Sequence, residues 1–121
     1  MPENPRWFSP PLFGLKTYGD IFTPRQMATL TTLSDLVGEA MKRVHSDTLA
    51  VTQSDDKKSL REGGTGATAY SEAVRVYLAL AVDKATDYNT TLVAWSPTRD
   101  QAKSTFARQA LPMVWDYTEV N

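Results

Sequence analysis

The sequence contains no cysteine and only one histidine, His45. Without thiols the chain has neither a disulfide nor a thiolate metal site of its own. A metal site needs several convergent nitrogen, sulfur or carboxylate ligands, and one imidazole near the end of a helix has no evident partners. We therefore expect no metal site and a solvent-exposed His45.

Long apolar runs and an excess of charge of one sign are also lacking. No apolar run approaches the ~20 residues of a membrane helix, and the first residues lack the apolar core of a secretory signal. The net charge is −1, with basic and acidic residues balanced in both halves. These absences predict no membrane segment, favour a cytoplasmic protein and argue against a strongly basic nucleic-acid footprint. What is present is 41% hydrophobic residues in 121, which suits one modest core.

Prolines dominate the start of the chain, and a helix signal follows them. The prolines predict an extended arm over residues 1–22. The arm should dock through large apolar side chains: Trp7, Phe8, Leu12, Phe13 and Leu15. Thr23 is a good N-cap, Pro24 suits the first helical position and Gln26 completes a capping box, so a helix is predicted over residues 23–50. Its buried stripe should comprise Met27, Leu30, Leu33, Val37, Ala40, Met41 and Val44.

The second half of the chain predicts further helices. Residues 52–66 are polar and glycine-rich, which predicts a flexible linker. A second helix is predicted over residues 67–88, and its centre is apolar nearly all round, so it should be buried on several sides. A short strand near residues 91–95 and a shorter third helix over residues 97–110 complete a mainly α fold.

The last residues, 111–121, form an apolar tail. Its large side chains are Leu111, Met113, Val114, Trp115 and Val120. Because domains usually end in polar, loosely held residues, this tail predicts a single helical piece of a larger protein, truncated at the tail. Trp95 and Trp115 either stack an extruded base or belong to the core, and the apolar surroundings favour the core.

The glycine-rich stretch offers one apparent cofactor motif. Gly64-Thr-Gly-Ala-Thr-Ala69 matches a dinucleotide fingerprint and precedes a helix. The fingerprint requires a buried strand before it, whereas residues 57–62 are charged, so a linker is favoured. Asp55-Asp56 is interpreted as a solvated charge pair. With one histidine, no Ser-His-Asp constellation can be assembled.

Two Arg-Gln pairs, one opening the first helix and one closing the third, are the candidate DNA-binding residues. Arginine clamps phosphate and glutamine reads adenine through N6 and N7. The alternative is structural: the first glutamine only completes a helix cap, and the second arginine pairs with Asp116 or Glu119. The candidates are Arg25, Gln26, Arg108 and Gln109.

Three stretches of the chain carry a family resemblance. They are FGLKTYGDIFTPRQ (13–26), YLALAVDKATDYNTTL (77–92) and TFARQALPMVWDYTEVN (105–121). They resemble the middle section of large adenine-specific DNA methylases whose amino-terminal part carries a domain of unknown function. The resemblance covers almost the whole chain, with residues 52–66 the least alike.

The resemblance implies that the parent protein uses S-adenosylmethionine to methylate N6 of adenine in DNA. The family's glycine-containing cofactor loop and its Asp/Asn-Pro-Pro-Tyr motif are both missing, since Pro10-Pro11 stands in Ser-Pro-Pro-Leu. We therefore expect no catalytic, cofactor or metal residue here, and a non-catalytic segment that assists DNA engagement. The alternative is a scaffold that packs on the remainder of the methylase or on a partner, and it predicts self-association through the apolar tail.

Overall fold

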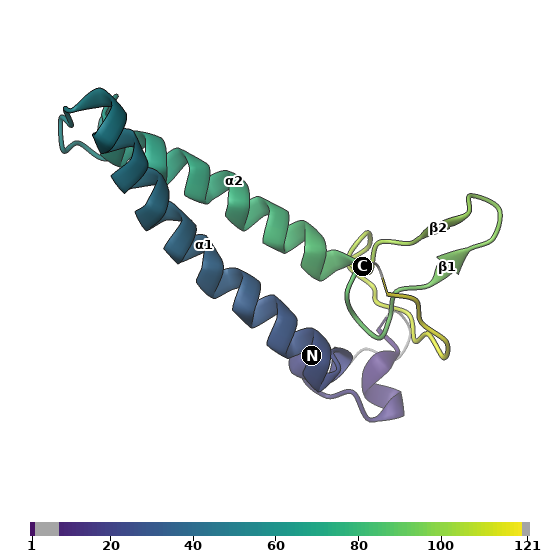
Figure 1. Ribbon diagram of the computed structural model, residues 1–121. Coiled ribbons are helices and arrows are strands. Elements are labelled where there is room, and N and C mark those ends of the chain that lie inside the picture. Colours follow the sequence, from purple (N-terminus) through teal and green to yellow (C-terminus); the bar gives the residue numbers. More distant parts are fainter. Residues whose placement is uncertain (2–7, 120–121) are drawn as a thin grey trace. The chain divides into compact units, whose positions relative to one another are not determined.

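The computed structural model describes Met1 and residues 8–119, and this part of the chain is mainly helical, as predicted (Figure 1). None of the helices in these residues is both long and apolar enough to cross a membrane. The regular elements are two helices and a two-stranded antiparallel sheet: α1 (Pro24–Thr52), α2 (Ala67–Asp87), β1 (Trp95–Ser96) and β2 (Gln101–Ala102).

The chain divides into two compact units. The terminal unit combines residues 1–30 with residues 84–121, and the helical unit is the continuous segment 31–83. The core of the terminal unit is therefore built from both ends of the sequence. Its buried members are Phe8, Ile21, Leu92 and Leu111, and the side chains packed against them are Met1, Leu15, Phe22, Met113 and Val114.

The start of α1 is capped as the sequence predicts. Thr23 Oγ1 accepts a hydrogen bond from the Gln26 backbone N–H at 3.2 Å, and Gln26 Oε1 accepts from the Thr23 N–H at 2.9 Å. This reciprocal pair satisfies two of the donors that a helix start leaves open. The helix ends at Thr52, where Gln53 adopts a left-handed conformation with φ 54°.

The helices themselves are confirmed, but their burial is lower than predicted. In α1 only Gln26 and Leu30 are buried, so the predicted stripe is for the most part half-buried or exposed. In α2 the centre is open: Tyr77 is 76% exposed and Leu80 is 57% exposed. The prediction that α2 is buried on several sides is wrong for this chain taken alone, because no described segment covers that face.

The predicted extended arm is interrupted by short 3-10 turns at Pro10–Phe13 and Tyr18–Ile21. The fixed φ of proline suits the first turn as well as it suits extended chain. Gly14 ends that turn with φ 92°, a value that glycine adopts without a Cβ penalty. Phe8 is buried as expected, whereas Leu12 is 63% exposed. The docking prediction for Trp7 lies outside the described residues.

The predicted third helix over residues 97–110 is wrong. A hairpin takes its place, with Trp95 opposite Ala102 and Ser96 opposite Gln101, and Asp100 in the turn has φ 50°. Beyond the hairpin, residues 103–110 form turns and bends. This segment has no continuous apolar stripe, so hydrogen bonds to the end of α2 outweigh its modest helix propensity. The strand predicted near 91–95 is replaced by the two-residue strand β1, which overlaps the predicted range only at Trp95.

Candidate anion-binding pocket

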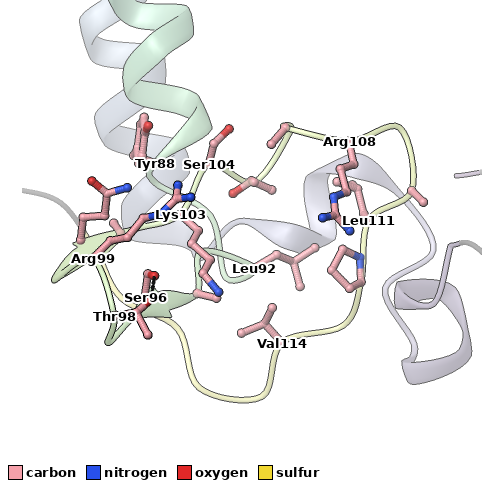
Figure 2. A pocket seen from close by; sticks show the side chains of 17 residues that line it. Tyr88, Leu92, Ser96, Thr98, Arg99, Lys103, Ser104, Arg108, Leu111 and Val114 are labelled. Carbon is pink, nitrogen blue, oxygen red and sulfur yellow. Dashed lines mark hydrogen bonds between the residues drawn. The ribbon is translucent and has the colours of Figure 1, made fainter.

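A pocket of about 710 Å³ lies in the terminal unit and is lined by residues between Tyr88 and Val114. The β1–β2 hairpin supplies one side of it, and the chain that follows β2 supplies the other (Figure 2). In this view Arg99 and Lys103 lie on the hairpin side, Arg108 lies across the pocket, and Leu92 and Val114 lie between them. The volume falls within the range of ordinary small-ligand sites.

The carboxylate of Asp87 holds the chain that follows β2. Ser104 Oγ donates to both carboxylate oxygens, at 2.7 and 2.6 Å, and the Phe106 N–H donates at 2.9 Å. Burial is the largest single influence and raises the pKa of Asp87, but these hydrogen bonds together with Lys84 bring the pKa below its ordinary value. Asp87 therefore positions the pocket wall as an ionised carboxylate.

Threonine hydrogen bonds attach the pocket wall to the rest of the terminal unit. Thr90 and Thr105 share a hydrogen bond of 2.9 Å between their hydroxyls, and both residues are buried. The Thr91 N–H donates to the carbonyl of Ile21 at 2.8 Å, which joins the pocket to the amino-terminal segment. Of these three threonines only Thr105 is among the pocket-lining residues, so its bond to Thr90 links the wall to the segment that follows α2.

Among the described residues three cations and no carboxylate line the pocket: Arg99, Lys103 and Arg108. All three side chains are exposed, and none makes a hydrogen bond, ion pair or ring contact with the described residues. By contrast, Lys84 nearby pairs with Asp87 at 3.4 Å and lies over the Tyr88 ring at 4.6 Å. A concave surface with three unpaired cations favours a ligand of negative charge.

Of the predicted DNA-binding residues, only Arg108 lines this pocket; Gln109 is exposed beside it. Sequence reasoning missed Arg99 and Lys103. The available signal was local charge, because residues 88–115 contain three basic side chains and one acidic side chain, Asp100. The balanced charge of the whole chain conceals that local excess.

Arg25 and Gln26 are engaged elsewhere in the terminal unit. Both donate to the carboxylate of Glu119, Arg25 through Nη2 to Oε2 and Gln26 through Nε2 to Oε1 at 2.7 Å. Gln26 is only 4% exposed, so it cannot reach a base edge. The alternative role of Gln26 as a cap is confirmed. The alternative pairing of Arg108 with Glu119 is not seen, because Glu119 pairs with Arg25 instead.

Asp55 binds the start of α2 and Asp56 binds the chain that precedes it, so neither is merely solvated. Asp55 accepts the hydroxyl of Thr68 at 2.6 Å and its N–H at 3.1 Å, and these bonds lower the pKa of Asp55 to about 2. Asp56 accepts the N–H groups of Thr65 and Lys58 at 2.9 and 3.1 Å, which lower its pKa as well. Whether this hydrogen-bonded segment is mobile in solution stays a prediction.

The same hydrogen bonds explain why the dinucleotide-like glycine motif does not serve a phosphate. A Cβ placed on Gly66 would lie 2.3 Å from Asp55 Oδ1, and one on Gly64 would lie 2.3 Å from the carbonyl of Lys58. Gly66 therefore allows the chain's own carboxylates to approach the helix start, where an anion is favoured, and Gly64 allows the backbone of Lys58 to approach. The position that a pyrophosphate takes in the fingerprint is filled by aspartate.

His45 joins this cluster without forming a catalytic relay. Its Nε2 lies 3.6 Å from Asp55 Oδ2 and 3.4 Å from Thr68 Oγ1. A relay needs the acid on one ring nitrogen and the nucleophile on the other, whereas here the same nitrogen faces both. Among the described residues no group of three or more histidine or acidic side chains is arranged to hold a metal ion.

The tryptophans lie on the surface of the terminal unit. Trp95 is 48% exposed and Trp115 is 77% exposed, so the interpretation of both as core residues is wrong. Trp115 contacts Phe13 edge to face, with ring centroids 4.9 Å apart. The tail is only partly available to a partner, because Leu111 is buried in the core. Val120 lies outside the described residues.

The pocket does not fit S-adenosylmethionine, the cofactor that the family resemblance implies for the parent protein. That molecule carries a sulfonium, an ammonium and a carboxylate group, so its net charge is positive, and its ribose hydroxyls and ammonium call for acidic partners. The pocket has three cations and no carboxylate on its lining. Because like charges at close range repel, this lining is unsuited to the cofactor.

Comparison with known proteins adds no family to these observations. A scan against protein-family models, a search of curated proteins and a search of solved structures found no match. The methylase resemblance therefore remains an expectation drawn from the three stretches of sequence.

Proposed function

We propose that this chain is a non-catalytic, DNA-contacting segment of a larger, cytoplasmic DNA adenine-N6 methyltransferase. Two supports carry the proposal. The family resemblance suggests the parent activity, and the three unpaired cations of the pocket suggest where phosphate is contacted. The second is the decisive observation, because phosphate contacts from arginine and lysine supply most of the affinity of nonspecific DNA binding.

The contact set of this proposal differs from the one that the Arg-Gln pairs suggested. Arg25 is held by Glu119, so its charge is locally neutralised. Arg99, Lys103 and Arg108 have no such partner among the described residues. DNA binding should therefore depend on the pocket cations and little on Arg25.

The test is a titration of a fluorescently labelled duplex with the full chain, followed by anisotropy at low and moderate salt. The triple variant R99A/K103A/R108A should weaken binding and make the logarithm of the binding constant less salt-dependent, by up to about 0.9 in slope per lost contact. A matched triple variant, K42A/R43A/R61A, removes the same charge from exposed positions in the helical unit. Equal loss in both triple variants would reject the pocket as the DNA contact.

A second candidate function is a scaffold that binds the rest of the methylase or another protein. The observation that favours it is the open face of α2, where Val76, Tyr77 and Leu80 are each more than half exposed. Contiguous exposed apolar side chains of this size often mark interaction surfaces. The test is sedimentation of the wild type beside Y77E, together with binding of a dye that reports exposed apolar surface. A wild-type monomer that binds no dye would count against the scaffold.

A further inference from the structure

We propose that the pocket of the terminal unit binds a terminal phosphate, that is, a phosphate monoester, carried either by a free nucleotide or by the end of a nucleic-acid strand. The inference rests on the proposed function in that it assigns a ligand class to the same pocket. It goes further because an internal backbone phosphate and a terminal phosphate differ in charge, and the pocket distinguishes them by charge.

The balance of charge is the first argument. Arg99, Lys103 and Arg108 line the pocket without a carboxylate among the lining residues. An internal phosphodiester carries one negative charge, whereas a monoester carries about −1.5 to −2 at neutral pH. A concave site lined by three cations gains more electrostatic stabilisation from the more highly charged group, and its charge-assisted hydrogen bonds are stronger.

A buried hydroxyl is the second argument. Ser96 is 5% exposed and lines the pocket at the end of β1. Its Oγ lies 3.5 Å from Thr98 Oγ1, which is long beside the usual ~2.7–2.8 Å for hydroxyl pairs. Figure 2 shows these two hydroxyls together on the hairpin side. A buried hydroxyl with so weak an internal bond is well suited to donate to a ligand oxygen.

The rest of the pocket lining is partly apolar, which suits a ligand with an organic group attached to its phosphate. Leu92, Leu111 and Val114 supply apolar surface, and Figure 2 shows Leu92 and Val114 between the two cationic sides. At about 710 Å³ the pocket is far larger than a phosphate group requires. A compact organic body attached to the phosphate, such as a nucleoside, would cover this apolar surface while its phosphate meets the cations.

The closing experiment compares matched ligands on the full chain. Adenosine monophosphate is compared with adenosine by calorimetry, and a short single strand with a 5′-phosphate is compared with the same strand bearing a 5′-hydroxyl. We expect the phosphorylated member to bind at least about tenfold more tightly in each pair. R99A/K103A/R108A should abolish the preference and K42A/R43A/R61A should retain it. S96A, which changes no charge, should reduce the preference several-fold.

The results distinguish a free nucleotide from a strand end as the ligand, and they distinguish this inference from the proposed function. Preference for the phosphorylated strand with weak binding of adenosine monophosphate assigns the pocket to strand ends. Binding of the mononucleotide without binding of any DNA supports the inference and rejects the proposed function. Equal, salt-dependent binding of both strands, lost in the pocket triple variant, overturns the inference and leaves the proposed function intact. If neither ligand pair nor duplex binds, both fail.

Discussion

The hydroxyl of Thr68 donates a hydrogen bond of 2.6 Å to Oδ2 of Asp55, across thirteen residues of sequence. The Thr68 N–H donates to the other oxygen of the same carboxylate at 3.1 Å. One side chain of the connecting segment thus caps α2 from outside the helix. His45, near the end of α1, lies 3.6 Å from the same carboxylate, so three parts of the helical unit meet at Asp55.

Removing the Thr68 hydroxyl should weaken this cap. Thr68→Val keeps the shape of the side chain and loses the 2.6 Å bond, so we expect the free energy of unfolding to fall by about 1–2 kcal/mol. Thr65→Val is the matched control, since Thr65 contributes its backbone N–H and no side-chain bond. Urea denaturation followed by circular dichroism measures both, and equal losses would contradict the role of the hydroxyl.

The pH dependence of stability should carry the signature of Asp55. Its pKa is about 2 in the folded chain against an ordinary value of 3.8, because Thr68 donates twice to the ionised form. A lowered folded pKa gives stability that is complete above about pH 4 and is lost as the pH falls to about 2. In Asp55→Asn the thermal melting temperature should therefore change less with pH in this window. Asp47→Asn, on the exposed surface of α1, should leave the dependence of melting temperature on pH unchanged.

Three glycine-to-alanine substitutions should differ in whether they stabilise or destabilise the fold. At Gly38, inside α1, an added Cβ meets nothing within 4 Å, so alanine should stabilise by about 1 kcal/mol through helix propensity. At Gly64 and Gly66 it would lie 2.3 Å from Lys58 O and Asp55 Oδ1 respectively, so both variants should destabilise. Chemical denaturation of the three variants side by side is the measurement. If Gly66→Ala instead stabilised the fold, Asp55 could move away from the added Cβ without loss of stability.

Glu119 should stabilise the fold more through its hydrogen bond with Gln26 than through its ion pair with Arg25. The Arg25 side chain is 71% exposed, and exposed ion pairs contribute about 0–1 kcal/mol. Gln26 is buried, so loss of its acceptor is more costly. We expect Glu119→Ala to lower the free energy of unfolding by about 1–2 kcal/mol and Glu119→Gln, which retains an acceptor oxygen, by about 0.5 kcal/mol. A double-mutant cycle with Arg25→Ala measures the ion pair itself, and a larger loss in Glu119→Gln would contradict the ranking.

Asp87 should support DNA binding without touching DNA. Asp87→Ala removes the acceptor of Ser104 and Phe106, so the chain that carries Arg108 loses its attachment to the end of α2. We expect weaker DNA binding together with lower stability, by about 1–2 kcal/mol. Ser104→Ala, which loses only the hydroxyl, should show a smaller fall in both quantities. Unchanged DNA affinity in Asp87→Ala would mean that the pocket wall does not depend on this carboxylate.

The elements that the sequence predicted well are those specified locally. Thr23, Pro24 and Gln26 are adjacent, and their cap chemistry is sufficient to place the start of α1. The apolar run from residue 67 onward similarly located α2 to within one residue of its end. Neither prediction required knowledge of any distant segment.

The predictions that failed depend on residues far apart in the sequence. The chain after β2 follows Asp87 because of tertiary hydrogen bonds, which no pattern within 97–110 reveals. Arg25 is likewise neutralised by Glu119, 94 residues away. For the pocket, Arg108 was selected from a dipeptide pattern, whereas Arg99 and Lys103 required the hairpin that brings them to the same concave surface.

The terminal unit also constrains the order in which the chain assembles. Ser9 Oγ accepts the Met113 N–H at 2.7 Å across 104 residues, and the Thr118 N–H donates to the carbonyl of Val93. The amino-terminal half of the terminal unit therefore cannot complete its packing until the last part of the chain has been synthesised. Residues 31–83 are contiguous and can pack as soon as they leave the ribosome. Phe8 and Ile21, which are buried in the finished unit, therefore stay in contact with water until the last part of the chain has been made.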